Sequence, residues 1–540
     1  MSTRSLRDRW LLFVPPVLYA AAITNYVLPD TFDNLIYLNG ARAIHDTGEF
    51  TFGGWFVWDW PPGFAFLLSL AAGVGFGSVA AAKVVVCCLV SLAVAAAYRL
   101  LERGEWRHPL ASAVIAALAP YAFLQGTRVM ADWPYVAIAM AFLLVLGALD
   151  GKRRGVGLAV LAGALLAASA LVRHVGVVLG AAVVAQAWTR FRARGSLAWW
   201  RAPALEVLVA ALGGGAFLAA KLRILPAVRA GAAWSEYQEG TGFLFHPDLV
   251  AWARLVLDVL SHGTSLAARA PVPSPVVSVA ALAVSSFMVA GLIAKFRRSG
   301  ATPVWTYTVA NLVLILLLEW KWSRYLLPVA PFVVSAFLEG VELLSNRIPA
   351  RVRAFGPAAL VVWGVMLFAM DTTLLVRGNG VTHRGLSAAV SDSPERFYLG
   401  EWNDLYRACA VVRDSNREGG VIVLDRADLK YVAHWCERPV IQGEPLRRGG
   451  DFWRRACGMR APFAPGTGLA LRTKAGRAPE PWPAPSTLSP QPLGDVARCQ
   501  GSFVLSARNA PLPPGAPPAE AIATFGDLRL TTLSPQIHEF

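Results

Sequence analysis

Apolar residues occur in long runs throughout the first two-thirds of the chain, and polar residues separate the runs. A helix needs about 20 consecutive apolar residues to cross a bilayer. The runs predict about eleven membrane-spanning helices, at residues 11–29, 79–99, 109–126, 134–149, 155–172, 175–189, 203–222, 275–294, 303–319, 326–344 and 355–375. The pattern therefore predicts an all-α polytopic membrane domain over residues 1–375.

Basic residues form short clusters between these runs. They lie at Arg4, Arg7 and Arg9; Arg99, Arg103 and Arg107; Lys152, Arg153 and Arg154; Arg190, Arg192 and Arg194; Lys295, Arg297 and Arg298; and Arg347, Arg351 and Arg353. The clusters after the first fall at every second loop, so they share one side of the membrane, which the positive-inside rule makes cytoplasmic. If residues 62–78 lie flat at the outer interface instead of spanning, the first cluster joins them. This arrangement places the N-terminus in the cytoplasm and the C-terminus outside.

The N-terminal run is not followed by a small-residue cleavage site, so we expect a retained first span rather than a signal peptide. The segments that then face outward are 30–78, 127–133, 173–174, 223–274, 320–325 and a tail at 376–540. Loop 223–274 could be a lid over a site or an ordinary surface loop.

The tail is less hydrophobic than the rest of the chain and has short strand-like segments. The sequence VIVLD (421–425) predicts a buried strand, a helix is expected around 426–435, and PVIQG, GLALRTK, SFVLSA and DLRLTTL are further strand candidates. We expect a small periplasmic α/β domain. Its four cysteines, Cys409, Cys436, Cys457 and Cys499, allow three pairings into two disulfides, or remain unpaired buried thiols.

Composition agrees with a membrane protein. The chain is 55% hydrophobic and only 16% charged, whereas soluble chains are about a quarter charged. The 19 Trp residues lie largely near the ends of apolar runs, as in an interfacial aromatic belt. The formal net charge of +15 does not indicate nucleic-acid binding, because the basic residues lie between apolar runs rather than on a soluble module. No convincing glycine-rich nucleotide motif is present.

The first outer loop carries the most informative chemistry. It contains Asp30, Asp33, Asp46, Glu49 and Asp59 close to the membrane. The apolar spacing after Asp33 predicts an amphipathic helix along the surface, which holds Asp33 at the membrane edge. A carboxylate there can accept a proton from an acceptor hydroxyl or amine, as a general base. We interpret Asp46 and Glu49 as solvated loop residues.

The same loop resembles the GT-C superfamily of membrane glycosyltransferases, in particular the group of lipid A aminoarabinose transferases and protein O-mannosyltransferases. The matching stretches are Asp33-Asn34, Tyr37, Gly40-Ala41-Arg42, Thr47-Gly48-Glu49 and Pro61-Pro62-Gly63. Similar stretches follow in order in TRVMADWPYVA, ALVRHVGVVLG and KWSRYLLPVAPF, and together they cover residues 10–345. The sequence departs from the family at Asn34, where a second acid is usual, and at Trp60, often basic in the aminoarabinose group.

The resemblance implies a site on the outer face. It places Asp132 beside Asp33 as the second catalytic carboxylate. Guanidinium groups suit phosphate, so we assign Arg173, Lys321 and Arg324 to the phosphate of a donor, with snorkelling to the interface as the alternative. Residues expected to position substrate are Asn34, Tyr37, Asp59, Arg128, His174 and Tyr325. A structural role is the competing interpretation for His174 and for the two tyrosines, and we expect Pro328 and Pro331 to kink a helix near the site.

These observations predict a glycosyltransferase that moves a sugar from a polyprenyl-phosphate-linked donor to a lipid, glycan or protein acceptor on the outer face of a bacterial inner membrane. The alternatives are a transporter or flippase for polyprenyl-linked lipids, which would have inverted repeats and broken midplane helices, and a non-enzymatic membrane scaffold. We predict no cofactor and no metal site, although Asp33 could chemically bind a divalent ion.

Overall fold

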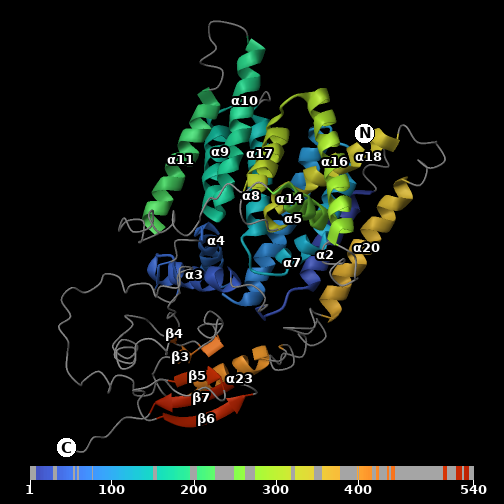
Figure 1. Ribbon diagram of the computed structural model, residues 1–540. Coiled ribbons are helices and arrows are strands. Elements are labelled where there is room, and N and C mark those ends of the chain that lie inside the picture. The colour runs from blue at the N-terminus through green and yellow to red at the C-terminus, as the bar shows by residue number, and fades with distance from the viewer. Residues whose placement is uncertain are drawn as a thin grey trace, which may run out of the picture.

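The computed structural model describes most of the membrane domain and the central part of the tail. The residues described are 8–27, 33–52, 55–56, 60–75, 77–149, 155–194, 204–224, 248–261, 274–317, 323–345, 356–377, 398, 401–415, 421–424, 435–436, 440–443, 503–507, 519–525 and 528–533. The described part of residues 1–377 is mostly helical, and the described part of the tail contains a helix and a sheet (Figure 1).

The N-terminal half begins with a short helical pair and continues through a bundle. Its elements are η1 (Asp8–Phe13), α2 (Val14–Ala21), α3 (Asp33–Thr47), β1 (Thr51–Phe52), β2 (Trp55–Phe56), α4 (Gly63–Gly73), α5 (Val79–Arg103), α6 (Pro109–Leu118), α7 (Pro120–Gly126), α8 (Asp132–Ala148) and α9 (Val156–Val172). The remaining membrane elements are η2 (His174–Val178), α10 (Leu179–Arg194), α11 (Ala204–Ile224), α14 (Leu249–Ser261), α16 (Ser274–Ser299), α17 (Pro303–Leu317), η4 (Ser323–Tyr325), η5 (Leu327–Val329), α18 (Ala330–Ser345) and α20 (Gly356–Arg377).

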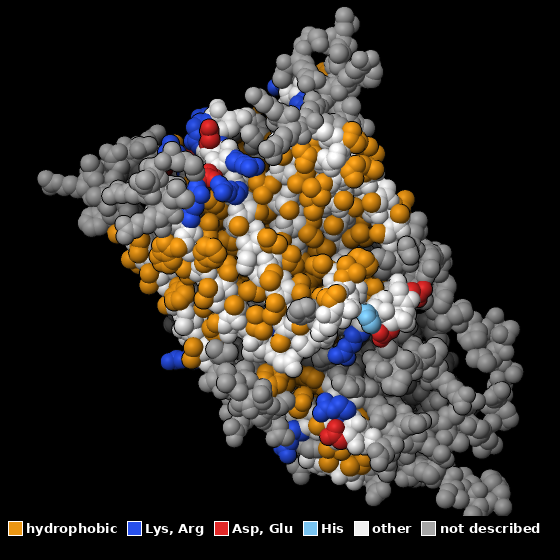
Figure 2. Space-filling view, turned by 180° about the vertical axis from the view of Figure 1, so that it is seen from behind, with side chains coloured by type: hydrophobic (Ala, Val, Ile, Leu, Met, Phe, Trp, Pro, Cys, Tyr) orange, Lys and Arg blue, Asp and Glu red, His pale blue; other side chains and the backbone are white. Residues whose placement is uncertain are grey.

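Several of these helices are suited to a bilayer. Within the part of the chain that the structure describes, four are long and apolar enough to span it: Val79–Arg103, Ser274–Ser299, Leu327–Leu344 and Ala358–Arg377. Shorter apolar helices accompany them. Hydrophobic side chains cover a broad belt of the surface, and charged side chains gather beyond both edges of the belt (Figure 2). These features are those of a multi-pass membrane protein.

The predicted spans differ from the observed helices where the backbone breaks. The described helix of the first span ends at Ala21, short of residue 29. The expected span 109–126 is two helices, α6 and α7, because Pro120 follows Ala119, whose ψ of 128° is not helical. Pro328 lies in η5, and Pro331 lies in the first turn of α18, where proline is tolerated. The prolines therefore mark a change from 3₁₀ to α-helix.

The expected loop 223–274 contains a packed helix. In α14, Ala253 and Val256 are fully buried, and Trp252 donates from Nε1 to the carbonyl oxygen of Leu312 at 3.1 Å. This helix contacts α16, α7 and η4. Residues 248–261 therefore belong to the bundle rather than to a loop, while 225–247 and 262–273 lie outside the described residues.

Ion pairs show which parts of the bundle share an end. Arg9 and Arg99 both pair with Glu102, His108 and Arg107 with Glu342, and Arg298 with Glu339. Near the other end of α5, Lys83 donates to the hydroxyl of Thr24 at 2.8 Å and to the carbonyl oxygen of Tyr26 at 2.9 Å. Basic clusters from η1, α5 and α16 therefore lie at one end, and the segment leading into α3 lies at the opposite end.

The tail contains α23 (Glu401–Asp414) and the strands β3 (Val421–Leu424), β4 (Val440–Gly443), β5 (Phe503–Ala507), β6 (Ala519–Phe525) and β7 (Leu528–Leu533). The strand order is β4-β3-β5-β7-β6, with β3 parallel to β4 and β5, and β7 antiparallel to β5 and β6. Four strands coincide with predicted segments. GLALRTK and most of the helix expected at 426–435 lie outside the described residues.

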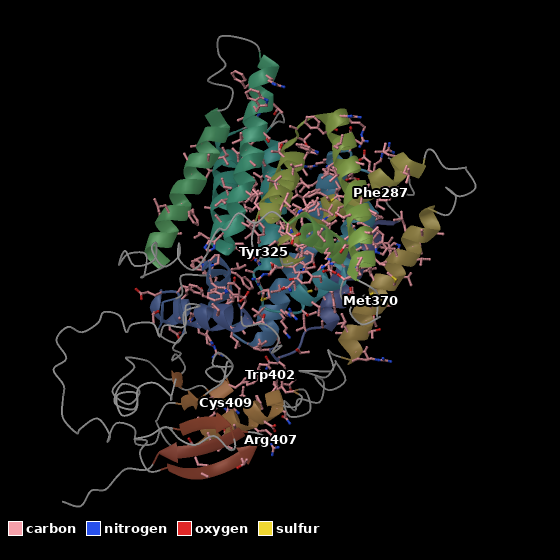
Figure 3. The ribbon with its side chains drawn as sticks, viewed as in Figure 1. Phe287, Tyr325, Met370, Trp402, Arg407 and Cys409 are labelled. Atoms are coloured by element: carbon pink, nitrogen blue, oxygen red, sulfur yellow. A yellow bond between two sulfur atoms is a disulfide. The ribbon has the colours of Figure 1, made fainter. Side chains whose placement is uncertain are left out.

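A disulfide-linked aromatic cluster joins the tail to the membrane domain. Cys409 in α23 is bonded to Cys436, and the neighbouring Trp435 ring packs at 4.9 Å from that of Tyr398. Tyr398 donates from its hydroxyl to the carbonyl oxygen of Val27 at 3.0 Å. Figure 3 shows Trp402 and Cys409 in the part of the tail nearest the bundle. Cys457 and Cys499 lie outside the described residues.

Candidate active site

Two ion pairs form the centre of the candidate site. Asp33 is the first residue of α3, and its Oδ2 accepts a hydrogen bond from Arg324 of η4 at 2.7 Å. Asp132 is the first residue of α8, and its Oδ1 accepts from Arg173, the residue that follows α9. A carboxylate at a helix N-terminus is also favoured by the helix dipole. Two acids predicted from separate loops therefore each meet a predicted phosphate-binding arginine.

Tyr325 connects the two pairs. The guanidinium carbons of Arg173 and Arg324 each lie 5.6 Å from the centre of its ring. Burial lowers the pKa of Arg324, but the carboxylates of Asp132 and Asp33 outweigh it and hold the pKa above its ordinary value. Figure 3 shows Tyr325 close to α3 and α4, where these helices meet the bundle. The two carboxylates and the two guanidiniums thus form one charge cluster.

The four side chains of the charge cluster are mostly buried, but three of them remain partly exposed to solvent. The side chain of Asp132 is 1% exposed, while those of Arg173, Arg324 and Asp33 are 14%, 16% and 20% exposed. The Oδ2 atom of Asp132 is buried and has no hydrogen-bond partner among the described residues. Such an acceptor costs free energy unless a ligand or water satisfies it. Asp132 therefore offers an acceptor to a hydroxyl group, while Asp33 remains accessible.

Trp60 is part of the cluster, although the sequence did not predict this role. Its Nε1 donates to Oδ1 of Asp33 at 3.1 Å, so each oxygen of this carboxylate has a donor. The sequence marked Trp60 only as a departure from the GT-C pattern. The signal that could have found it is its position beside Pro61-Pro62-Gly63, in the same loop as Asp33.

Close backbone packing brings the start of α4 and the turn of η2 against the end of α9. A Cβ on Gly63 would lie 2.7 Å from the carbonyl carbon of Leu171, and one on Gly176 would lie 2.4 Å from that of Ser169. Only glycine permits both approaches without a shift of the backbone. The start of α4 and the turn of η2 therefore pack against the last turn of α9, whose C-terminal neighbour is Arg173.

Two tyrosines lie beside the charges. Tyr37 is buried, and its ring packs edge-on against that of Phe64 at 5.2 Å. Burial, with the nearby carboxylate of Asp33, raises the pKa of Tyr37, so its phenol stays neutral. Tyr121 of α7 was not predicted as a site residue. It interacts electrostatically with Asp132, Arg324, Arg128 and Arg173. Its hydroxyl accepts from Gln125 at 2.9 Å.

The other predicted site residues are distributed as follows. Arg128 is buried between α7 and α8, and its charge acts on the same tyrosine as those of the cluster. Asn34 is buried at the start of α3, and His174 begins η2 beside Arg173. Asp59 and Lys321 lie outside the described residues. Among the residues that the structure describes, no group of three His, Cys, Asp or Glu could hold a metal ion.

Comparison with known proteins shows which known fold the chain resembles. No family model matches the chain, and no curated protein matches its sequence. Among solved structures, apo ArnT from Cupriavidus metallidurans superposes with a TM-score of 0.57 at 14% identity, covering 99% of this chain and 100% of that one. The same protein bound to undecaprenyl phosphate gives a TM-score of 0.56 at 14% identity, with the same coverage. The chain has an ArnT-like fold. The predicted GT-C resemblance is therefore confirmed at the level of the fold.

A second protein of known structure is more distant. The oligosaccharyltransferase of Archaeoglobus fulgidus, in complex with zinc and sulfate, gives a TM-score of 0.49 at 16% identity and covers 80% of this chain and 62% of that one. ArnT and this oligosaccharyltransferase are both GT-C membrane glycosyltransferases. The ArnT likeness extends over nearly the whole of both chains, so the charge cluster belongs to an ArnT-like scaffold.

Proposed function

We propose that the protein is a glycosyltransferase that moves a sugar from a polyprenyl-phosphate-linked donor to an acceptor hydroxyl or amine on the outer face of the inner membrane. The observation that carries the proposal is the cluster of Asp33, Asp132, Arg173 and Arg324, drawn from four separate segments to one place. The ArnT-like fold supports it, since that protein has been seen bound to undecaprenyl phosphate.

The reaction would use the two pairs differently. Asp33, the more exposed acid, accepts the proton of the acceptor as its oxygen or nitrogen attacks the anomeric carbon. The bond from that carbon to the phosphate oxygen breaks, and the polyprenyl phosphate leaves with the electron pair. Arg324 and Arg173 stabilise the charge that develops on the phosphate. Asp132, whose Oδ2 has no hydrogen-bond partner in the described part of the chain, accepts from a hydroxyl of the sugar or acceptor.

The position of the cluster supports transfer on the outer side. The basic residues of η1, α5 and α16 lie at one end of the bundle, which the positive-inside rule assigns to the cytoplasm. Asp33 begins α3, which lies at the other end of the bundle, on the side that faces the tail (Figure 1). Because the outer compartment lacks nucleotide sugars, the donor must carry its activation on a lipid. The tail would then be periplasmic or extracellular, and it would help to shape the acceptor site.

The test is transfer of radiolabel from a panel of polyprenyl-phosphate sugars into membrane acceptors. Purified wild type would be compared with Asp33→Asn and Asp132→Asn, and with Asp46→Asn as a matched control on the same helix, where the side chain is 59% exposed. Loss of a positioned base lowers rates about 10²- to 10⁴-fold. We expect such losses for the first two variants and wild-type rates for the control.

Transfer that survives Asp33→Asn in a folded protein would refute the assignment of the base. A lipid flippase would instead move the intact donor across vesicles without cleaving it, and a scaffold would do neither. The same vesicles report both activities, because the released polyprenyl phosphate and the translocated donor are separable by chromatography.

A further inference from the structure

The indole of Trp60 occupies an unusual place for a tryptophan near a membrane surface. The side chain is half-buried against the apolar core, but its only polar atom points at a carboxylate, with Nε1 3.1 Å from Oδ1 of Asp33. Interfacial tryptophans ordinarily face the headgroup region with this N–H. The direction of the N–H therefore calls for an explanation in terms of Asp33.

Asp33 is held from two sides. Arg324 donates to Oδ2 and Trp60 donates to Oδ1, and the donors come from segments 291 and 27 residues away. A carboxylate has about four lone-pair sites, so the two donors found among the described residues fix the plane of the group and occupy about half of its capacity to accept. Rotation about the bond between Cβ and Cγ would break both hydrogen bonds.

The two donors respond differently to an anionic substrate. A phosphate competes with Asp33 for the guanidinium of Arg324, because charge-assisted bonds to phosphate are strong and often bidentate. The neutral indole N–H offers one donor and no charge. When Arg324 turns toward a phosphate, Trp60 is the donor that continues to orient the carboxylate.

The backbone of Trp60 is well fixed for this purpose. It precedes Pro61 and Pro62, both buried, and then Gly63, whose close approach to Leu171 ties the start of α4 to the end of α9. Proline restricts both its own φ and the conformation of the residue before it. The indole is thus held by the same scaffold that holds Arg173.

We propose that Trp60 is a positioning residue that holds the Asp33 carboxylate in its reactive orientation while Arg324 engages the donor phosphate. The inference rests on the proposed function, because it requires Asp33 to be the base. It assigns to Trp60 no contact with the donor. The loss of the indole N–H should therefore lower kcat and leave the KM for the donor nearly unchanged.

The experiment uses Trp60→Phe, which keeps an aromatic ring and removes the donor. The matched control is Trp363→Phe: Trp363 is also half-buried and donates from Nε1 at 3.0 Å, to the carbonyl oxygen of Leu260 in the bundle. A misplacement of about 1 Å at a reacting group costs about 10²-fold in rate. We expect kcat to fall about 10- to 100-fold in Trp60→Phe, with the donor KM within about threefold of wild type and the control unchanged.

A second variant separates chemistry from packing. Benzothienylalanine incorporated at position 60 retains the shape of tryptophan and lacks the N–H, so it should reproduce the kcat defect with a wild-type melting temperature. Wild-type kcat in this variant would overturn the inference, as would a raised donor KM with unchanged kcat, or an equal loss in Trp363→Phe. If Asp33→Asn is inactive in the same assay, the proposed function survives each of these outcomes. Activity in Asp33→Asn would instead refute the proposed function itself.

Discussion

The two members of the ion pair between Asp132 and Arg173 differ in burial, so removal of each should lower the stability of the protein by a different amount. The side chain of Asp132 is 1% exposed and that of Arg173 is 14% exposed. Removal of one partner from a buried pair costs about 3–5 kcal/mol, because the remaining charge is uncompensated. The cost should therefore depend on which charge remains.

In Arg173→Met the buried carboxylate remains, although Arg324 still acts on it. We expect a loss of about 3 kcal/mol, at the lower end of that range. In Asp132→Asn the guanidinium remains, but it can reach water, it lies over the ring of Tyr325, and the amide oxygen can still accept its hydrogen bond. We expect about 1 kcal/mol for that loss. The double variant removes both charges and should be more stable than Arg173→Met alone.

The assay is thermal unfolding in detergent, followed by tryptophan fluorescence. For a chain of this length, 1 kcal/mol corresponds to roughly 1–2 °C in Tm. Arg173→Met should melt about 3–6 °C below wild type, Asp132→Asn about 1–2 °C below, and the double variant between them. Equal losses in the two single variants, or a double variant less stable than both, would refute the argument from burial.

Three further predictions follow from the packing and charge of the site. Arg324→Lys keeps the charge but loses the planar fork, so transfer should fall about 10- to 100-fold with a raised donor KM. Steady-state kinetics would compare this variant with Arg297→Lys, at an exposed position at the other end of the bundle, and an equal effect in both variants would contradict the prediction. Gly63→Ala should destabilise the protein by about 1–3 kcal/mol because the new methyl meets the backbone of Leu171, whereas Gly147→Ala, with nothing within 4 Å of the new Cβ, should melt like wild type. Replacing both Cys409 and Cys436 by Ala opens a loop with a sequence separation of 27 and should destabilise the tail by about 3–4 kcal/mol. Melting followed by near-ultraviolet circular dichroism would measure this loss of stability, and a melting curve equal to that of Cys88→Ala would contradict the prediction.

Sequence patterns predicted those elements whose apolar period is local. The spacing after Asp33 predicted α3, and the structure begins that helix at Asp33 with Leu35 and Ile36 fully buried. The run at 421–425 predicted β3 in the same way. The run at 109–126 was interpreted as one helix, because apolar composition alone does not reveal that the backbone breaks at Ala119.

Three other features could not be predicted from the sequence. The helix α14 was assigned to a loop, because it has only 13 residues and short apolar helices fall below the length at which a span is recognised. The disulfide between Cys409 and Cys436 belongs to one of the three pairings that the four cysteines of the tail allow, and sequence spacing does not select among them. Tyr121 was missed because an aromatic residue at the end of an apolar run has the same pattern whether it packs or lines a site.

The sequence by itself indicated the acids and arginines of the site. It indicated which acids and arginines lie at the ends of apolar segments, because burying a charge in a bilayer is costly wherever the residue occurs in the chain. Only the tertiary structure decided the pairing: Asp33 with Arg324 across 291 residues, Asp132 with Arg173 across 41, and Trp60 on the remaining oxygen of Asp33. Partners at such separations are chosen by the packing of whole helices, and here by close approaches such as that of Gly63 to Leu171. Local propensity carries no record of these contacts.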